Sequence, residues 1–331
     1  MTLRCSYIGN VSEGSAPHST ENHVARALEA NGVEVHRVHE QRFRWVPGEV
    51  PEGTDFVLWT HTHGFAPPRT HARQARFLAA MRARGVPTVS LHLDRWFDLD
   101  REPQLAEPFF QTDLVCTADG GNQDRFAALG INHAWYPPGV SGPECELGTY
   151  RPELAADVAF VGPWAGGYHP ESAHRRELVE WLRCTYGDRC RFWPAPGEHA
   201  VRGEQLRDLY ASVKVLVGDS CLVGTGRNAR YISDRVPETI GRGGLLVHPH
   251  VDGVTDRTLY TPGKHLLTWP AGDWDALRDT IDQALEDDDL RHHVSLDGRL
   301  HVLATGTYEV RVRELLADLA ERGLIKQEAA A

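Results

Sequence analysis

A single carboxylate, Glu238, stands near the start of a short predicted helix within residues 234–251, "DRVPETIGRGGLLVHPHV". Pro237 fits the first turn of a helix, because its missing N–H is not needed there. Three glycines then end the helix and permit close backbone approach. A carboxylate beside the N–H groups of a helix start can accept hydroxyl hydrogen bonds. This suits a ligand with vicinal hydroxyls beside phosphates, such as a nucleotide ribose. A glutamate that only caps the helix would give the same pattern.

A second candidate loop is the glycine-rich stretch in "FVGPWAGGYHPESAHRR", which follows a predicted strand. A glycine-rich turn from strand to helix can receive a phosphate on the helix N-terminus, and Gly162 opens this turn. The spacing matches neither GxGxxG nor a P-loop, so a plain connecting loop remains the alternative. Arg230, Arg235 and Lys264 would neutralise a diphosphate if they lie nearby. Otherwise they are solvated surface charges.

Polar side chains also follow two predicted strands of the first half, in "WTHTHGF" and "SLHLDRWFD". An imidazole or carboxylate at a strand end can take a proton from an acceptor hydroxyl. Asp94 is the preferred base, because it ends a strand beside Trp96 and Phe97, which would form a platform for a sugar or an acceptor. A carboxylate that only caps the following turn is the alternative. The polar candidates are His61, His63, His92, Asp94 and Asp98, of which His63 and His92 are the alternative bases.

Length and composition restrict the architecture that positions these residues. The chain has 331 residues, more than one hydrophobic core usually serves, so two domains are expected. Hydrophobic residues make up 41% and charged residues 24% of the chain, and no apolar run approaches the roughly 18 residues of a membrane span. The N-terminus lacks the layout of a signal peptide, which predicts a cytoplasmic protein.

The charge balance disfavours one class of partner. The 35 Lys and Arg against 46 Asp and Glu give a net charge of −11. General nucleic-acid binding relies on neutralising phosphates, so it is disfavoured, although a local basic groove is not excluded. The six cysteines are scattered without a CxxC pair, which predicts reduced thiols. Cys184, Cys190 and His199 could in principle hold a metal, but their spacing is not that of a metal site, and none is expected.

Strand and helix patterns alternate along both halves of the chain, which is typical of parallel sheets covered on both faces. The stretch "YPPGVSGPECELGTYRPEL" between them is rich in Pro and Gly and has no periodicity. The predicted fold class is therefore α/β, with two Rossmann-like doubly wound domains facing a cleft, where ligands bind beyond the carboxyl ends of the strands. The predicted parts are a first domain at 1–140, a linker at 141–153, a second domain at 154–307 and a C-terminal helix at 308–325.

Several features of the second half occur in the order seen in one family. "DVAFVGPW" with "RRELVEWL" looks like its opening strand and helix, and "YISDRVPETIGRGGLLVHP" looks like its Arg-x-x-Glu helix, with Arg235 and Glu238 in those positions. The tail from "LYTPGKHLLTWPAGDW" to "TYEVRVREL" has a similar Pro-Gly loop, acidic-aromatic segment and Thr-Tyr-x-x-Arg. The chain thus resembles the group 1 glycosyltransferases of the GT-B fold, in the branch of spore-maturation-protein-like (CgeB-like) enzymes. "SLHLDRWFDLD" and "YPPGV" match the family's first half more loosely.

The resemblance implies a metal-independent glycosyltransferase with no cofactor, whose nucleotide-diphosphate sugar is bound mainly by the second domain. The first domain would receive the acceptor, and the helix at 308–325 would cross back to it. Glu238 would bond the donor ribose, and Gly162, Pro163 and Trp164 would lie by the diphosphate or base. The full donor-binding set is Gly162, Pro163, Trp164, Arg230, Arg235, Glu238, Thr239 and Lys264. Many retaining members carry a further Glu eight positions before Glu238, where this chain has Arg230, so the stereochemical outcome stays open.

Two other functions fit the same pattern. A sugar-nucleotide epimerase would isomerise the donor, and a noncatalytic nucleotide-sugar-binding protein would leave it unchanged, whereas a transferase usually releases some free nucleotide diphosphate. The sequence does not identify the acceptor. A small molecule, a protein, a glycan or a modified DNA base would each be compatible with the first domain.

Overall fold

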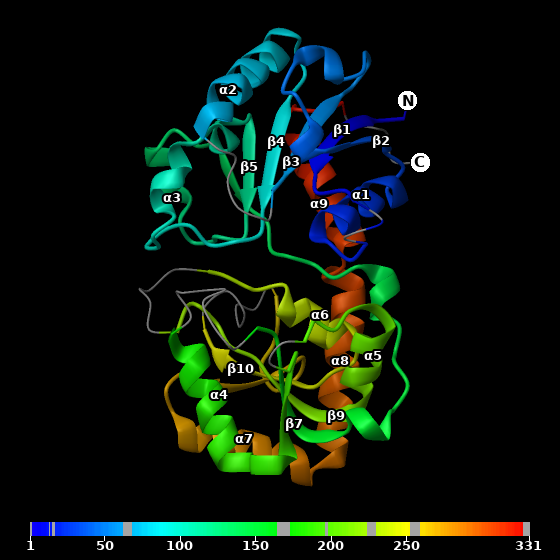
Figure 1. Cartoon of the computed structure of the whole chain (residues 1–331), viewed down its shortest axis with the longest axis vertical. Coiled ribbons are helices and arrows are strands. Elements are labelled where there is room, and N and C mark those ends of the chain that lie inside the picture. Colours follow the sequence, from blue (N-terminus) through cyan, green and yellow to red (C-terminus); the bar gives the residue numbers. More distant parts are fainter. Residues whose placement is uncertain are drawn as a thin grey trace. The chain divides into compact units, whose positions relative to one another are not determined.

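A computed structural model describes residues 2–12, 14, 17–61, 68–163, 173–195, 198–223, 230–251 and 259–326. The chain divides into two compact units (Figure 1). The first unit comprises Met1–Pro137 and Tyr308–Ala331, and the second comprises Pro138–Thr307.

The first unit contains a parallel sheet with the strand order β2-β1-β3-β4-β5-β6. Its strands are β1 (Arg4–Gly9), β2 (Glu34–His39), β3 (Phe56–Thr60), β4 (Thr88–His92), β5 (Leu114–Thr117) and β6 (His133–Trp135). Its helices are α1 (Thr20–Ala30), α2 (Pro68–Ala83), α3 (Gln123–Ala128) and α9 (Tyr308–Glu321). Each of these elements lies where the sequence pattern predicts it.

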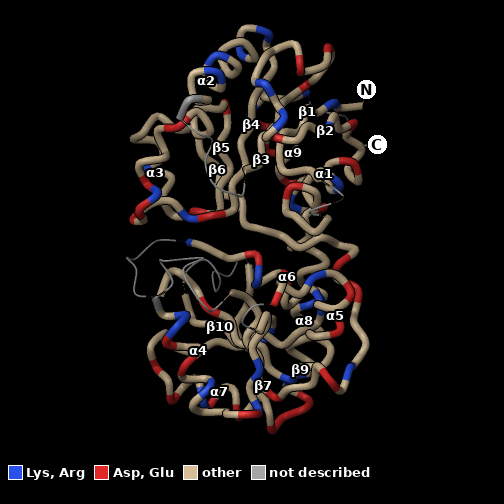
Figure 2. The backbone as a smooth tube through the Cα atoms, viewed as in Figure 1, with Lys and Arg blue, Asp and Glu red and all other residues tan. Residues whose placement is uncertain are grey.

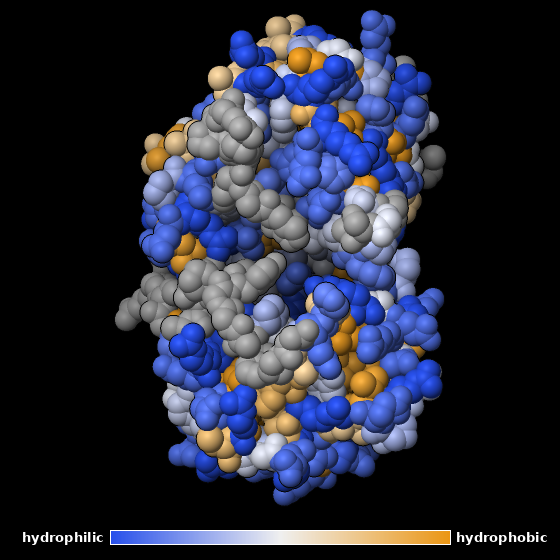
Figure 3. Space-filling model, viewed as in Figure 1, coloured by the Kyte–Doolittle hydropathy of each residue, from blue (hydrophilic) through white to orange (hydrophobic). Residues whose placement is uncertain are grey.

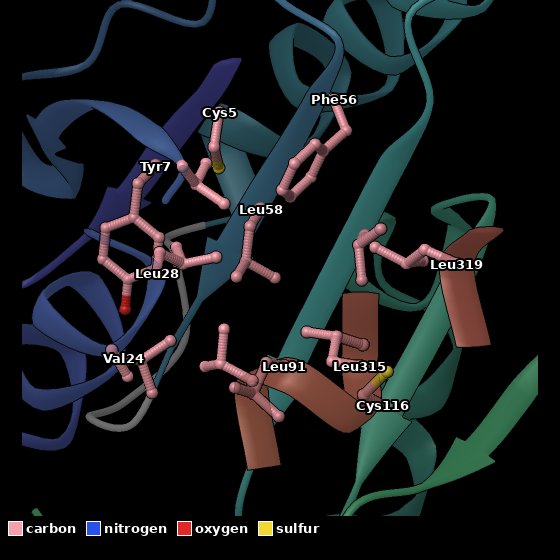
Figure 4. Packing of buried hydrophobic residues seen from close by; sticks show 14 of the residues in the cluster. Cys5, Tyr7, Val24, Leu28, Phe56, Leu58, Leu91, Cys116, Leu315 and Leu319 are labelled. Carbon is pink, nitrogen blue, oxygen red and sulfur yellow. The ribbon is translucent and has the colours of Figure 1, made fainter. Parts of the chain in front are cut away.

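Alternate strand residues of the first unit belong to two separate cores, as the period of two requires. Tyr7 packs in one core with residues of α1 and α9, while its neighbour Ile8 packs in the other with residues of α2 and α3. Figure 4 shows Leu315 and Leu319 of α9 in the first of these cores. Burying each of these leucines contributes about 1.5–3 kcal/mol. The last helix is therefore an integral part of the first unit.

Local signals set the ends of α1 and tie it to α9. Ser19 is the N-cap of α1, because its side chain accepts a hydrogen bond from the Asn22 N–H at 3.2 Å. Asn31 ends the helix, and its side-chain amide donates to the carbonyl oxygen of Glu309 at 2.9 Å. The residue that stops one helix thus also fixes the start of another that is distant in sequence.

The second unit contains a parallel sheet with the order β11-β10-β9-β7-β8. Its strands are β7 (Ala156–Val161), β8 (Cys190–Trp193), β9 (Val213–Val217), β10 (Leu246–His250) and β11 (Leu267–Pro270). Its helices are α4 (Ala173–Tyr186), α5 (Gly203–Ser212), α6 (Arg235–Gly241), α7 (Trp274–Glu286) and α8 (Asp288–Thr305). Phe160 packs with residues of α4 and α7, and Ala159 packs with residues of α5 on the opposite face.

The predicted linker at 141–153 packs as part of the second unit. It forms two short 3₁₀ helices, Gly142–Cys145 and Pro152–Leu154. Arg151 is ion-paired with Asp208 of α5 at 2.8 Å, and Glu144 is ion-paired with Arg242, which directly follows α6. Proline and glycine therefore mark irregular backbone here, held against the unit by ion pairs.

On the face of the molecule drawn in Figure 3, hydrophilic residues prevail and apolar ones are scattered among the described residues. The charged residues in Figure 2 lie mainly on helices and loops, with arginines prominent along α2. Among the residues that the structure describes, no helix is both long and apolar enough to cross a membrane.

Gly298 lies on α8, at its contact with α6. A Cβ at this position would lie 2.4 Å from the carbonyl oxygen of His265 and 2.8 Å from Cγ2 of Ile240. We expect Gly298→Ala to lower the free energy of unfolding by about 1–3 kcal/mol, because the overlap outweighs the roughly 1 kcal/mol gained in helix propensity. Chemical denaturation measures this change. At Gly306 a Cβ would meet its nearest atom at 3.4 Å, so Gly306→Ala is the control. Equal stabilities of the two variants would contradict the packing argument.

Candidate active site

A buried carboxylate at the carboxyl edge of the second sheet accepts hydrogen bonds from arginines in the first turns of two helices. Asp219 follows β9 and is 6% exposed. Its Oδ2 accepts a hydrogen bond from Nε of Arg175 on α4 at 2.6 Å, and its Oδ1 accepts from Nη1 of Arg235 on α6. Arg175 also donates to the carbonyl oxygen of Pro163 at 2.9 Å. Two guanidinium groups share one carboxylate, so these three side chains leave an excess positive charge at this edge.

Gly162 directly follows β7 and lies against this cluster. Its φ is +141°, and a Cβ there would lie 2.3 Å from Nη2 of Arg235. Both the backbone conformation and the neighbouring guanidinium therefore require glycine. Arg235 also lies over the ring of Phe160, 5.1 Å from its centroid, which fixes the guanidinium plane. Gly162 and Arg235, two of the predicted donor-binding residues, thus lie side by side, and their role in donor binding stays a prediction.

Glu238 lies in the first turn of α6 and is partly buried. Its carboxylate accepts no hydrogen bond from any residue that the structure describes. The pKa of Glu238 is raised from 4.5 to about 7, first by burial and then by the nearby charge of Asp234, against the opposing charges of Arg242 and Arg202. A desolvated carboxylate without a donor costs stability. Such a group at the ligand-binding edge of a sheet is a candidate binding or catalytic group.

The close backbone approach expected at the glycines that end α6 is made to other parts of the same unit. A Cβ at Gly241 would lie 2.9 Å from Sγ of Cys145, and one at Gly244 would lie 2.5 Å from Cδ1 of Leu216. They let the helix end pack closely on its own unit. The helix also begins at Arg235, two residues before Pro237, and the Glu238 N–H donates to the Asp234 carbonyl at 3.0 Å. The Glu238 N–H is therefore not among the free N–H groups of the helix start.

The remaining predicted donor residues are only partly brought together. Thr239 is 2% exposed and forms a hydrogen bond with the buried Tyr210 side chain. It therefore packs α6 against α5. Pro163, Arg230 and Lys264 are exposed. Trp164 lies outside the described residues, as does His63 of the first half. The donor role of each remains a prediction.

Sequence reasoning missed three polar residues of this edge, Asp219, Arg175 and His248. Burial lowers the pKa of His248 on β10 to about 4, so its ring is neutral at pH 7. One sequence feature could have indicated Asp219 as a site residue: it is the first acid after a buried apolar strand, in "KVLVGDS". Nothing in the local sequence indicated that its partners would come from helices 44 and 16 residues away.

In the first unit, Asp94 and His92 lie at the end of β4, as predicted. Oδ2 of Asp94 accepts a hydrogen bond from Nη1 of Arg101 at 2.8 Å. The Asp94 N–H donates to Nδ1 of His92 at 3.2 Å. The carboxylate is thus engaged by a cation and the imidazole by a backbone group. The role of either residue as a base remains a prediction.

The aromatic platform expected beside Asp94 is wrong. Trp96 is 0% exposed and Phe97 2%, because the backbone N–H groups of both donate to Oδ2 of Asp119, at 2.9 and 3.0 Å. Both rings consequently pack in the core with Phe110 and Phe126. Neither ring can stack on a sugar.

A histidine–carboxylate pair follows the neighbouring strand. Nδ1 of His61, directly after β3, lies 2.7 Å from Oε2 of Glu40. Oε1 of Glu40 accepts a hydrogen bond from Nε1 of Trp59 at 2.7 Å. The sequence indicated His61 as a strand-end candidate. It gave no sign of Glu40, which follows β2 and reaches His61 only through the fold.

Comparison with known families gave a match in the second half of the chain. Residues 174–317 match a family described as glycosyl transferase-like. This segment runs from the start of α4 into α9 and contains Asp219 and α6. A comparison with curated protein sequences gave no significant match.

Solved structures share the whole fold at low sequence identity. An alpha-glucosyltransferase in complex with UDP and DNA containing an HMU base is 8% identical, with a TM-score of 0.68 over 96% of this chain and 99% of that chain. HepE from Anabaena, in complex with UDP and glucose, is 13% identical, with a TM-score of 0.59 over 96% and 100%. Sucrose-phosphate synthase from Thermosynechococcus elongatus is 14% identical, with a TM-score of 0.53 over 97% and 100%. The GT-B fold class predicted from the sequence is confirmed. The fold and the family match together bear out the predicted class of enzyme, a glycosyltransferase.

The raised pKa of Glu238 predicts that the free energy of unfolding depends on pH. A carboxyl group whose pKa is about 7 in the folded protein and 4.5 in the unfolded chain stabilises the fold fully below pH 4.5 and loses this contribution as the pH rises through 7. We therefore expect Glu238→Gln to match the wild type near pH 4.5. At pH 8 it should be more stable, by on the order of 1–3 kcal/mol. Denaturant melts across this range measure the difference.

The exposed loop residue Glu198 provides the control for this experiment, as Glu198→Gln. A difference between Glu238→Gln and the wild type that does not change with pH would refute the assignment.

Proposed function

We propose that this protein transfers a sugar from a nucleotide-diphosphate sugar to an acceptor hydroxyl, and that its second unit binds the donor at the carboxyl edge of its sheet. The observation that carries the proposal is the Glu238 carboxylate, which is desolvated and accepts no hydrogen bond from any described residue. Two ribose hydroxyls would supply the missing donors. A carboxylate oxygen that accepts from a hydroxyl forms a charge-assisted hydrogen bond, which is stronger than one between neutral groups.

The cations beside Glu238 support binding of the diphosphate. Arg235 and Arg175 together carry one more charge than Asp219 neutralises, and Gly162 lets the backbone pass close to Arg235. We propose that this charge stabilises the leaving diphosphate and that the reaction needs no divalent metal. As further parts of the proposal, the protein belongs to the spore-maturation-protein-like branch and works in the cytoplasm. Both rest on the sequence pattern alone.

A donor panel tests the proposal. UDP, GDP, ADP and dTDP, and sugars carried on each, are added to the protein with and without EDTA while its melting temperature is followed. A ligand that binds the folded state raises this temperature as its concentration exceeds Kd. We expect one nucleotide to do so in the presence of EDTA. Slow release of free nucleotide diphosphate would indicate transfer, isomerised donor an epimerase, and an unchanged donor a binding protein.

Glu238 gives the residue-level prediction. Glu238→Ala should weaken binding of the identified nucleotide by roughly 1.5–3 kcal/mol, the scale of hydrogen bonds to a charged group. Calorimetry of this variant beside Glu198→Ala measures the effect. The 2′,3′-dideoxynucleotide should bind the wild type as weakly as the normal nucleotide binds Glu238→Ala. Undiminished affinity of Glu238→Ala would remove Glu238 from the ribose site.

A further inference from the structure

The outer face of helix α2 carries positive charge in an otherwise acidic chain. From Phe56 to Leu93 the sequence has five arginines and no Asp or Glu, although the whole chain has a net charge of −11. Four of these arginines belong to α2, and Figure 2 shows arginines along this helix. The charge of this helix is thus opposite to the net charge of the protein.

Burial divides α2 into two faces. Phe77, Leu78 and Met81 are at most 4% exposed and pack in the core of the first unit. The described side chains of α2 that are exposed are either small or cationic: Ala72, Arg73, Ala75, Arg76, Ala79, Arg82 and Ala83. The outer face is therefore narrow, and no large apolar side chain is exposed among its described residues.

Most of the charge on this face is not neutralised within the first unit. Arg82 is ion-paired with Asp113 at 3.2 Å. Arg73 and Arg76 of the helix, and Arg84 directly after it, have no ion-pair partner among the residues that the structure describes. Arg76 and Arg84 donate to backbone carbonyl oxygens, at 3.2 and 2.9 Å, which leaves their charge in place. Three guanidinium groups are thus available to an anionic partner over about 16 Å of helix length.

We infer that α2 binds double-stranded DNA by lying along its major groove, with its arginines on the phosphates. The groove is about 12 Å wide and admits a helix, which is about 10–12 Å across, and the exposed alanines keep this helix narrow. Arg73 and Arg82 are about two and a half turns apart, so they extend from opposite flanks of the exposed face. Each border of the groove therefore has an arginine facing its phosphates.

The residue types on this face indicate binding without base specificity. Arginine binds phosphate oxygens through paired, charge-assisted hydrogen bonds, and such contacts position a protein on DNA without reading its sequence. Adenine is read mainly by the side-chain amides of Asn and Gln. The one amide of α2, Gln74, is 1% exposed. We therefore expect duplexes of different sequence to bind equally well.

Other anionic partners fit this face less well. A helix that binds a membrane surface buries large apolar side chains among the lipids, and protein interfaces are centred on large, mostly aromatic, anchors. The exposed residues of α2 have alanine in place of both. The major groove of an RNA duplex is too deep and narrow to be read by side chains. Duplex DNA requires only a narrow helix and positive charge.

The test measures binding of a fluorescent DNA duplex of about 20 base pairs, two helical turns, by fluorescence anisotropy. We expect a Kd of about 10⁻⁶–10⁻⁴ M, the range of non-specific binding. The logarithm of the binding constant should fall with the logarithm of the salt concentration with a slope of about −2.7. This slope follows because three arginines without an acid partner would release the counterions of about three phosphates.

Three double variants locate the binding surface. Arg73→Gln/Arg76→Gln should weaken binding at least about tenfold at low salt and reduce the slope to about −0.9. Arg73→Lys/Arg76→Lys keeps the charge and should keep the slope. Arg278→Gln/Arg313→Gln, at exposed positions of α7 and α9, changes the net charge by the same amount as the first variant and should bind as wild type. All three should melt as the wild type does, because the changed side chains are exposed.

Several outcomes would overturn the inference. Absence of duplex binding by the wild type is one, and an equal loss of affinity in Arg278→Gln/Arg313→Gln is another. Vesicles of phosphatidylserine and phosphatidylcholine, and poly-L-glutamate, serve as competitors. If either displaced the duplex at the same concentration of negative charge, the assignment of α2 to DNA would be wrong. Equal affinity for single-stranded DNA of the same length would refute the placement in the groove.

Nucleotide binding by the second unit should be the same in all of these variants. The outcome for α2 is therefore independent of the proposed sugar transfer.

Discussion

The carboxylate of Asp219 holds together the parts of the second unit that surround the proposed donor site. It stands at the end of β9 and accepts hydrogen bonds from Arg175 of α4 and Arg235 of α6. Without it, two guanidinium groups would repel each other across a poorly hydrated space. With it, both are placed beside Gly162, where the backbone conformation and the close approach of Arg235 exclude a side chain. One buried acid thus links the end of β9 to the first turns of two helices and leaves an excess of guanidinium charge beside Gly162.

Glu238 and Glu144 show how two carboxylates near one helix acquire different roles. Glu144 is neutralised by Arg242 and fastens the segment before β7 to α6. Glu238, on α6 itself, has only its carbonyl oxygen bonded by Arg242, at 3.1 Å. Its carboxylate is left partly buried with a pKa raised to about 7. The first arrangement stabilises the fold, whereas the second lowers stability at neutral pH and keeps a hydrogen-bond acceptor for a ligand.

Hydrogen-bond direction separates the roles of similar groups in the first unit. His61 and His92 end neighbouring strands and differ mainly in what Nδ1 contacts. A carboxylate at Nδ1 makes His61 a donor there, while a backbone N–H makes His92 an acceptor at Nδ1. Asp119 has a comparable effect on the backbone, because its bonds to the N–H groups of Trp96 and Phe97 turn both rings into the core.

Periodicity by itself determined the strands, the helices and the fold class. Each predicted strand and helix is present, because buried strands such as "DFVLWT" and amphipathic helices such as "HRRELVEWL" carry their pattern locally. Glu238 was also found from sequence, since an acid at a helix start before a buried strand is a local signal. The tertiary structure alone decided the partners: Asp219 with Arg175 and Arg235, and Glu40 with His61. These contacts join residues from different βα units, and a side chain's burial, tautomer and charge depend on which of them the packed fold brings within hydrogen-bonding distance.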